Sequence, residues 1–196
     1  MIAPRASPRI DHAAAARAID DFVRALGHGS DPALAGTGRR VAALWSDELL
    51  DGYGCDVDAL IADAVPVFEG DSLVVVESIA THVVCPHHLT IATGVSTVGY
   101  RPVDRVLGFG AVAALVDAYA HRFALQEDVG AAIARALVDK LGASGAACAM
   151  RLRHGCLALH GPKQRSSRVL TLATAGAPSE SDVAIVSASL RRRSRP

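Results

Sequence analysis

The spacing of apolar residues changes along the chain from a helical period to a strand period. From Ile10 to Leu26 apolar side chains recur at helical spacing in an Ala-rich segment, and a second helical stripe runs from about Gly38 to Leu50. From Asp71 the pattern becomes short and β-branched, first in SLVVVESI and then in IATGVSTVGY. The pattern therefore predicts two N-terminal helices followed by two strands.

Helical spacing returns between Gly108 and Phe123, and again from Glu127 to Leu141. Two more strand-like runs follow, AACAMRLRHGCLALHG and SRVLTLAT, with the turn GPKQRSS between them. The order strand, strand, helix, helix, strand, strand predicts an α+β fold, in which a four-stranded antiparallel sheet carries both helices on one face. The opposite face of the sheet is then open to other contacts, such as a partner subunit.

These elements divide the chain into four segments. Residues 1–9 are typical of a flexible leader, and residues 10–66 form an N-terminal helical region. Residues 67–176 contain the predicted sheet and its two helices, and residues 177–196 form a C-terminal segment that ends in the basic tail RRRSRP. A terminal run of like charges usually lies in solvent, and an interaction element is the alternative.

Composition and charge narrow the class of function. The 196 residues include 20 basic and 20 acidic side chains, so the formal net charge of +0 gives no overall field that would attract nucleic acid or an anionic membrane. No uninterrupted apolar run reaches the roughly 18 residues that a membrane span needs. Charged residues interrupt any secretory signal near the start. We therefore expect a cytoplasmic protein that acts on a small molecule.

Two short motifs each combine a cysteine with histidine. In VVCPHHLT, Cys85 and His88 are three residues apart, and Pro86 and His87 lie between them. In RHGCLALHG, His154 and Cys156 would share one face of an extended strand. Zinc prefers thiolate and imidazole ligands in a tetrahedral site. Packing is the alternative for either motif alone, because a lone cysteine often serves as a small buried side chain. Spacing does not choose between the two adjacent histidines as ligand.

Together with two further motifs, these residues resemble the GTP cyclohydrolase I family. Four motifs follow the family's order along the chain. CPHHL matches its Cys-x-His-His turn, LGF its Leu-Gly helix start, LQED its Gln-Glu pair and HGC its His-x-Cys strand. The resemblance covers about residues 10–175 and includes TGRR, which is similar to the family's Thr-Pro-x-Arg. It implies the tunnelling fold, in which residues 67–176 would form the catalytic domain. Sheets of several subunits then join into a barrel, usually in a ten-subunit homo-oligomer with sites between subunits.

The resemblance also implies a role for each of eight residues: three zinc ligands, two proton-carrying histidines and three contacts to a purine-like or pterin-like substrate. The zinc ligands would be Cys85, His88 and Cys156, and the proton carriers would be His87 and His154. The substrate contacts would be Glu127, Gln126 and Arg40. In the family, metal-activated water attacks C8 of a guanine-type ring, and this carbon leaves as formate. Glu127 would hold the guanine-type edge, and histidine suits the proton transfers because its ordinary pKa is about 6.5.

The chain departs from the family where cationic residues hold the substrate's triphosphate. The corresponding positions carry neutral residues or histidine, namely Ala43, Gly110, Ala111, Ala114 and His160. Each charge-assisted hydrogen bond to phosphate contributes roughly 1.5–3 kcal/mol, so losing three costs on the order of 5 kcal/mol. We therefore expect a zinc-dependent cyclohydrolase that releases formate from a guanine-like heterocycle without a triphosphate.

Two alternatives remain open at this point. The first is a true GTP cyclohydrolase I that makes 7,8-dihydroneopterin triphosphate, for pterin and tetrahydrofolate synthesis, with its phosphate site relocated to Lys163, Arg165 and Arg168. The second is a non-catalytic, zinc-stabilised oligomeric protein.

Overall fold

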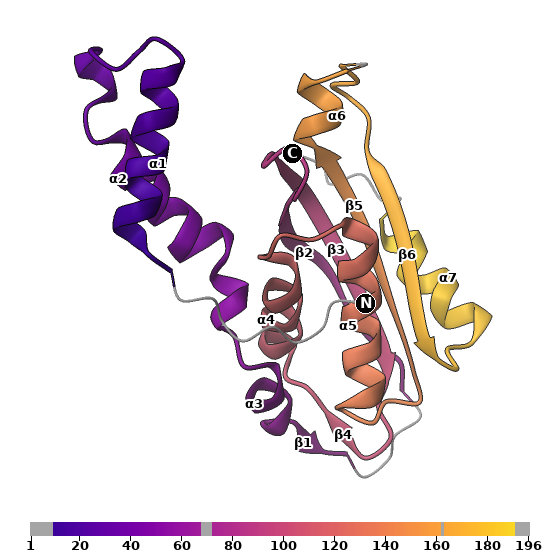
Figure 1. The fold of residues 1–196 in the computed structure, drawn as a ribbon. Helices are drawn as coiled ribbons and strands as arrows, with labels where there is room; N and C mark the ends of the chain where they lie inside the picture. Colours follow the sequence, from indigo (N-terminus) through magenta and orange to yellow (C-terminus); the bar gives the residue numbers. More distant parts are fainter. Residues whose placement is uncertain (1–9, 68–71, 162, 191–196) are drawn as a thin grey trace.

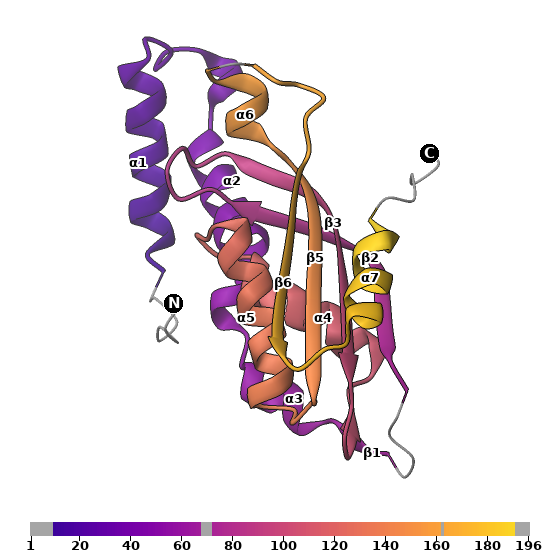
Figure 2. The ribbon, with the colours of Figure 1, turned by 90° about the vertical axis from the view of Figure 1, so that its right-hand side faces the viewer.

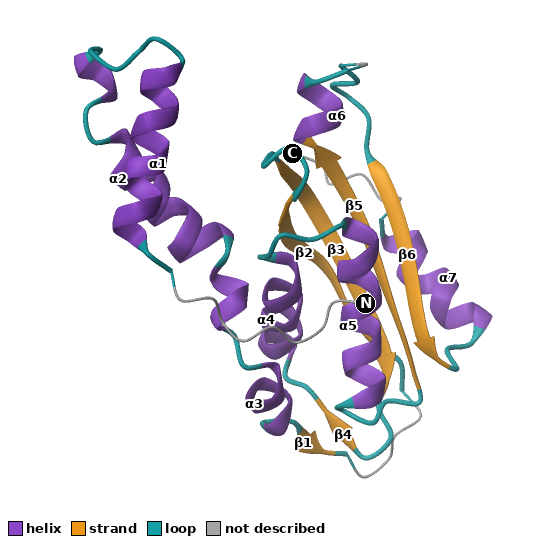
Figure 3. Cartoon of the chain, in the orientation of Figure 1, coloured by secondary structure: helices purple, strands orange, loops and turns teal. Residues whose placement is uncertain are grey.

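A four-stranded antiparallel sheet in the order β2-β3-β5-β6 forms the centre of the molecule. The computed structural model describes residues 10–67, 72–161 and 163–190. The strands are β2 (Val74–Val84), β3 (Ile91–Arg101), β5 (Gly145–His154) and β6 (Val169–Gly176). Helices α4 (Phe109–Ala120) and α5 (Gln126–Asp139) lie side by side on one face of this sheet (Figures 1 and 3). The predicted α+β class, with its sheet and helix pair, is confirmed.

The main core lies between the sheet and these two helices. The helix-facing residues of β5 and the inward stripe of α5 are completely or almost completely buried; they include Cys148, Met150, Leu152, Ile133 and Leu137. Burying a side chain of this size contributes about 1.5–3 kcal/mol to stability. This packing holds the first turn of α5 against the end of β5, where the candidate site lies.

Helix α7 (Glu180–Ser189) covers part of the opposite face of the sheet (Figure 2). Its Val186 packs against Ala147 and Ala149 of β5. The expectation of an open face is therefore corrected, and this helix was not predicted from its weak apolar pattern. A capping box formed by Ser179 and Asp182 was the local signal for its start.

Helices α1 (His12–Ala25) and α2 (Thr37–Leu44) pack against each other in an arm that stands apart from the sheet (Figure 1). Gly38 allows their close approach, because a Cβ there would lie 2.3 Å from the carbonyl oxygen of Ala16. The second helix ends earlier than the pattern predicts and continues as a π-helical turn, Trp45–Leu49. No residue of α1 is buried; Ile19 and Val23 are half-buried, whereas Phe22 is 61% exposed.

Short elements complete the chain between these parts. A 3-10 turn (Asp51–Gly54) and α3 (Val57–Ala62) follow the arm, β1 (Val65–Pro66) pairs with β4 (Arg105–Val106), and α6 (Gly155–Leu159) follows β5. The expected leader, residues 1–9, and the basic end, residues 191–196, lie outside the described residues. Within the part of the chain that the structure describes, every helix is too short or too polar to cross a bilayer.

Candidate metal and catalytic site

Strand pairing brings the two cysteine-histidine motifs to the same end of the sheet. The turn between β2 and β3 is closed by the Cys85 amide, which donates to the Thr90 carbonyl at 2.9 Å. Residue Ala92 of β3 pairs with His154, the last residue of β5. A Cβ at Gly155 would lie only 2.9 Å from the Ile91 carbonyl oxygen, so glycine lets the chain turn tightly beside β3.

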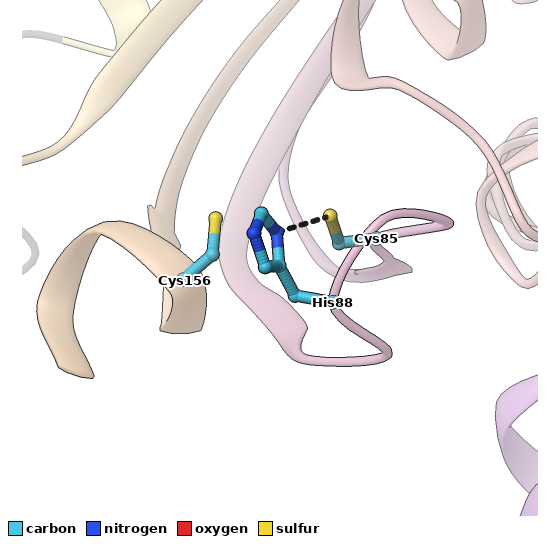
Figure 4. A group of neighbouring side chains, drawn as sticks. All are labelled: Cys85, His88 and Cys156. Carbon is cyan, nitrogen blue, oxygen red and sulfur yellow. Dashed lines mark hydrogen bonds between the residues drawn. The ribbon is translucent and has the colours of Figure 1, made fainter. Parts of the chain in front are cut away.

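Cys85, His88 and Cys156 present their ligand atoms to one small volume. These atoms all lie within 4.8 Å of one another, and Cys85 Sγ is 3.8 Å from His88 Nδ1. Figure 4 shows the imidazole of His88 between the two sulfur atoms. Around a tetrahedral zinc ion, with Zn–S about 2.3 Å and Zn–N about 2.0–2.1 Å, sulfur and nitrogen would be about 3.6 Å apart and the two sulfurs about 3.8 Å apart. The donor set and its spacing fit such an ion.

The geometry distinguishes the two adjacent histidines that spacing left open. Both are exposed, but His88 lies with the cysteines, whereas His87 is outside this group and its ring centroid is 6.3 Å from that of His88. Cys156 reaches the group from a different element than expected, because β5 ends at His154 and Cys156 lies in the first turn of α6. The expected alternation along a strand is therefore not the reason that these residues come together.

His154 is held by the first residue of α5. Its Nε2 lies 2.7 Å from Oε1 of Gln126, a side chain that is 1% exposed. Burial lowers the pKa of His154, and the negative charge of nearby Glu127 opposes this shift. The lowered pKa favours the neutral imidazole, which can accept a proton.

Glu127 is exposed in the first turn of α5, next to the buried Gln126. Asp128 is the other acidic residue of that turn. Negative side chains are stabilised at a helix N-terminus, where amide groups point outwards. Glu127 is therefore placed to present a carboxylate beside His154, whereas the amide of Gln126 is directed into the protein.

Arg40 is not brought to this group of residues. It lies in the arm, where its guanidinium donates to the Ala35 carbonyl at 3.0 Å and to Thr37 Oγ1 at 2.9 Å. In this chain Arg40 thus binds its own helical hairpin. A contact between Arg40 and a ligand held by α5 would have to come from another subunit.

Three of the family's phosphate positions, Gly110, Ala111 and Ala114, lie at the start of α4, at the opposite end of β3 from the Cys85, His88 and Cys156 group. Leu107 donates its amide to the Tyr100 hydroxyl at 3.0 Å, near the end of β3, whereas the cysteine turn precedes the start of that strand. The 11 residues of β3 span roughly 33 Å at about 3.3 Å per residue. A Cβ added at Gly110 would meet nothing within 4 Å, so this surface is open and without charge at that position.

For two residues near the site, the sequence predicted no contact with the other site residues. Thr171 of β6 accepts a hydrogen bond from Gln126 Nε2 at 2.9 Å, and no local signal indicated this contact across 45 positions. His160, noted only as a departure from the family, has its ring centroid 5.5 Å from that of His88. The sequence feature that could have indicated this proximity is its spacing, because His160 follows Cys156 by four residues, just beyond α6.

Comparison with known proteins gives a consistent family match. A family model described as GTP cyclohydrolase I matches residues 15–189. GTP cyclohydrolase 1 of Chromobacterium violaceum is 41% identical over 170 residues, which cover 85% of this chain and 81% of that protein. GTP cyclohydrolase 1 of Ralstonia nicotianae is 39% identical over 155 residues, 79% of this chain and 74% of that protein.

A solved structure, that of an archaeosine synthase QueF-Like protein in the apo form, is a more remote match. It aligns with a TM-score of 0.44 and 19% identity, covering 57% of this chain and 100% of that chain.

Proposed function

The chain belongs to the GTP cyclohydrolase I family and is a hydrolase that acts on cyclic amidines, and from this premise we propose that it uses zinc to open the imidazole ring of a guanine-like heterocycle without a triphosphate. The observation that carries this proposal is the convergence of Cys85, His88 and Cys156 next to the strand end that presents His154. Two thiolates and one imidazole leave one position of a tetrahedral zinc site open, as in catalytic zinc sites.

In this proposal the metal is held by those three side chains. A zinc ion there would supply a Lewis acid that makes water nucleophilic near neutral pH. The proposed reaction is a hydrolysis in two stages: one water would add to C8 of the substrate as a C–N bond of the imidazole breaks, and a second would release C8 as formate. The protein's own residues bind the heterocycle and move the protons that these steps require.

His154 and His87 are the proposed proton carriers. The lowered pKa of His154 keeps the imidazole neutral near pH 7, so that it can accept a proton and return it to a ring nitrogen. His87 is exposed beside His88 and is free of any role in the proposed ligand set. Glu127 would accept hydrogen bonds from the N–H groups of a guanine-type edge, because an ionised carboxylate is an acceptor only.

The absence of a triphosphate follows from what stands at the family's cationic positions. Gly110, Ala111 and Ala114 lie along the open start of α4 and offer no cation to a phosphate. Loss of three charge-assisted hydrogen bonds costs on the order of 5 kcal/mol, which is several thousand-fold in affinity. A nucleoside or a free base would lose none of this binding energy.

A complete site would form between subunits of a homo-oligomer. The start of α4 and Arg40 both lie away from the metal group in one chain, so neither can contact a ligand bound there unless a second copy supplies it. The family's ten-subunit assembly meets this requirement.

The test is to incubate the zinc-loaded protein with GTP, guanosine and related guanine-type heterocycles and to measure formate. We expect formate from a substrate without a triphosphate, and none from the Glu127→Gln variant. Asp128→Asn is the matched control, since it removes a carboxylate from the same helical turn but keeps Glu127. Efficient turnover of GTP alone would contradict the proposal.

A relocated phosphate site is the second candidate function, and the position of the loop before β6 favours it. Lys163, Arg165 and Arg168 are exposed between α6 and β6, at the metal end of the sheet. This candidate expects GTP turnover that collapses in the Lys163→Ala, Arg165→Ala double variant. Unchanged GTP turnover in that double variant would exclude it.

A further inference from the structure

The side chain of Gln126 is buried and bonded entirely within the protein. Its Nε2 carries two hydrogens and lies within hydrogen-bond distance of three acceptors: the Met150 carbonyl at 3.2 Å, the Val169 carbonyl at 3.3 Å and Thr171 Oγ1 at 2.9 Å. Its Oε1 lies 2.7 Å from His154 Nε2, and the residue is 1% exposed. A substrate could reach this amide only by displacing these partners, so direct substrate contact does not fit the observed arrangement.

The surroundings determine which way the amide of Gln126 faces. Met150 and Thr171 are paired across β5 and β6, and Val169 lies two residues before Thr171, so the three acceptors form one cluster across two strands. An amide nitrogen has only donor hydrogens, whereas the amide oxygen only accepts. Reversing the amide would set its oxygen against these two carbonyl oxygens, so the hydrogen bonds to them would be replaced by contacts between acceptors.

Because the amide oxygen faces His154, the histidine nitrogen that meets it must carry a hydrogen. We propose that Gln126 is a positioning residue, which holds His154 as the tautomer protonated on Nε2 and directs its Nδ1 lone pair to the reaction. This inference rests on the proposed function for the role of His154, but the tautomer itself does not depend on which substrate is used.

The network therefore assigns each His154 nitrogen a separate task. Nε2 keeps its hydrogen and stays bonded to Gln126, while Nδ1 accepts the proton during ring opening and later returns it. Glu127 is the next residue of α5, so the same helical turn holds the histidine through Gln126 and offers the carboxylate proposed to bind the heterocycle. Thr171 anchors this turn to β6 through Gln126.

The direct test is solid-state ¹⁵N NMR of the zinc-loaded protein labelled at histidine. The His154 signals are assigned by their loss in His154→Gln. In the parent protein we expect one neutral tautomer with the proton on Nε2. A proton on Nδ1, or an even mixture of tautomers, would overturn the proposal without any variant having to fold.

Gln126→Met removes both amide groups at nearly constant volume. We expect His154 to lose its single tautomer, and kcat to fall about 10- to 100-fold with little change in KM, as is typical when a group that orients a functional histidine is removed. Thr174→Val, an exposed change on the other face of β6, is the control and should change neither measurement.

The two proposals can fail separately. If no tested heterocycle yields formate but the Nε2-protonated tautomer is found and lost in Gln126→Met, the proposed substrate is wrong and the positioning role stands. If Gln126→Met raises KM and leaves the His154 tautomer unchanged, Gln126 binds substrate directly and the positioning role is refuted.

Discussion

At the scale of single residues, Gly155 controls how closely Cys156 approaches the turn that carries Cys85. A Cβ at this position would lie 2.9 Å from the Ile91 carbonyl oxygen and 3.1 Å from Thr90 Cβ. Both contacts are closer than normal packing allows; the first involves the start of β3, and the second involves the last residue of the turn before it. The metal group therefore depends on a residue that offers no ligand atom.

We expect Gly155→Ala to move α6 away from β3 and to weaken zinc binding about 10-fold or more, as for other residues that orient metal ligands. Competition with a chromophoric chelator measures this affinity. The control is Gly110→Ala, where a Cβ would meet nothing within 4 Å. Equal affinities in the two variants would show that the close approach at Gly155 does not shape the site.

Cys156→Ser should remove a thiolate from the proposed ligand set and reduce the bound metal well below one ion per subunit. Cys55→Ser is the matched control, because Cys55 is also partly exposed but lies outside the Cys85 group. Metal analysis of both proteins after gel filtration is the measurement. Retention of a full complement of zinc by Cys156→Ser would remove this residue from the ligand set.

At the scale of elements, one short segment fastens the arm to the sheet domain. The carbonyl of Gly52 accepts hydrogen bonds from the Arg122 guanidinium at 2.9 and 3.2 Å, and His121 Nδ1 lies 2.7 Å from Asp51 Oδ1. The rings of His82 and His121 stack with their centroids 3.7 Å apart. The end of α4 and strand β2 thus hold the turn through which the arm is connected.

This junction should make stability depend on pH. Burial, and next the nearby His121, lower the pKa of His82, while Asp51 and Asp117 oppose the shift. The unfolded chain then binds a proton at His82 more readily than the folded protein, so the free energy of unfolding should fall as the pH drops below about 6.5.

Urea unfolding at pH 7.5 and pH 5.5 tests this expectation. His82→Phe retains a stacking ring but cannot titrate, so it should lose less stability between the two pH values than the parent. His28→Gln removes an exposed histidine from the arm and should behave like the parent. An identical loss in the parent and in His82→Phe would contradict the role of His82.

Helix α7 is joined to β3 by an ion pair. Arg101 donates to both carboxylate oxygens of Asp182, at 2.7 and 2.9 Å, and this lowers the pKa of Asp182 from 3.8 to about 2. The resulting stabilisation is complete above pH 3.8 and is lost as the pH falls towards 2.

Asp182→Asn should lower the free energy of unfolding at pH 7 by about 1.5–3 kcal/mol, the usual contribution of hydrogen bonds to a charged group. Glu180→Gln removes an exposed carboxylate from the same turn and should have little effect. Chemical denaturation compares the two variants. A loss of equal size in both would show that the Arg101 contact is not its cause.

For the whole molecule, the arm and the position of α4 both indicate assembly. Phe22 and Leu26 are each 61% exposed on α1, in an arm whose two helices pack chiefly against each other. Apolar surface of this kind is stabilised when another surface covers it. We expect another copy of the chain to do so, since the start of α4 and the turn with Cys85 also lie at opposite ends of β3 within one chain.

Phe22→Glu should therefore reduce the mass of the assembled protein measured by analytical ultracentrifugation, because a carboxylate would have to be buried at the contact. Ala33→Glu adds the same charge at an exposed position near the tip of the arm and should leave the mass unchanged. A parent protein that sediments as a monomer would refute the assembly.

The sequence by itself determined the order of the core elements and most of the residues of the candidate site. Apolar periods of two and of 3.6 residues are local properties, so the sheet strands, α4 and α5 were predictable from short windows. Cys85 and His88 share one turn, so their proximity was also local. The second motif was correctly paired with the first, although for a reason that the fold changed.

Only the tertiary structure decided where β5 ends, what covers part of the second face of the sheet and which way Gln126 points. The direction of the Gln126 amide depends on Thr171, 45 residues further along the chain. The helix that covers the second face is joined to the sheet by an ion pair between Arg101 and Asp182, 81 positions apart. Such contacts are set by strand register and by the need to satisfy buried polar groups, and neither is encoded in a local pattern.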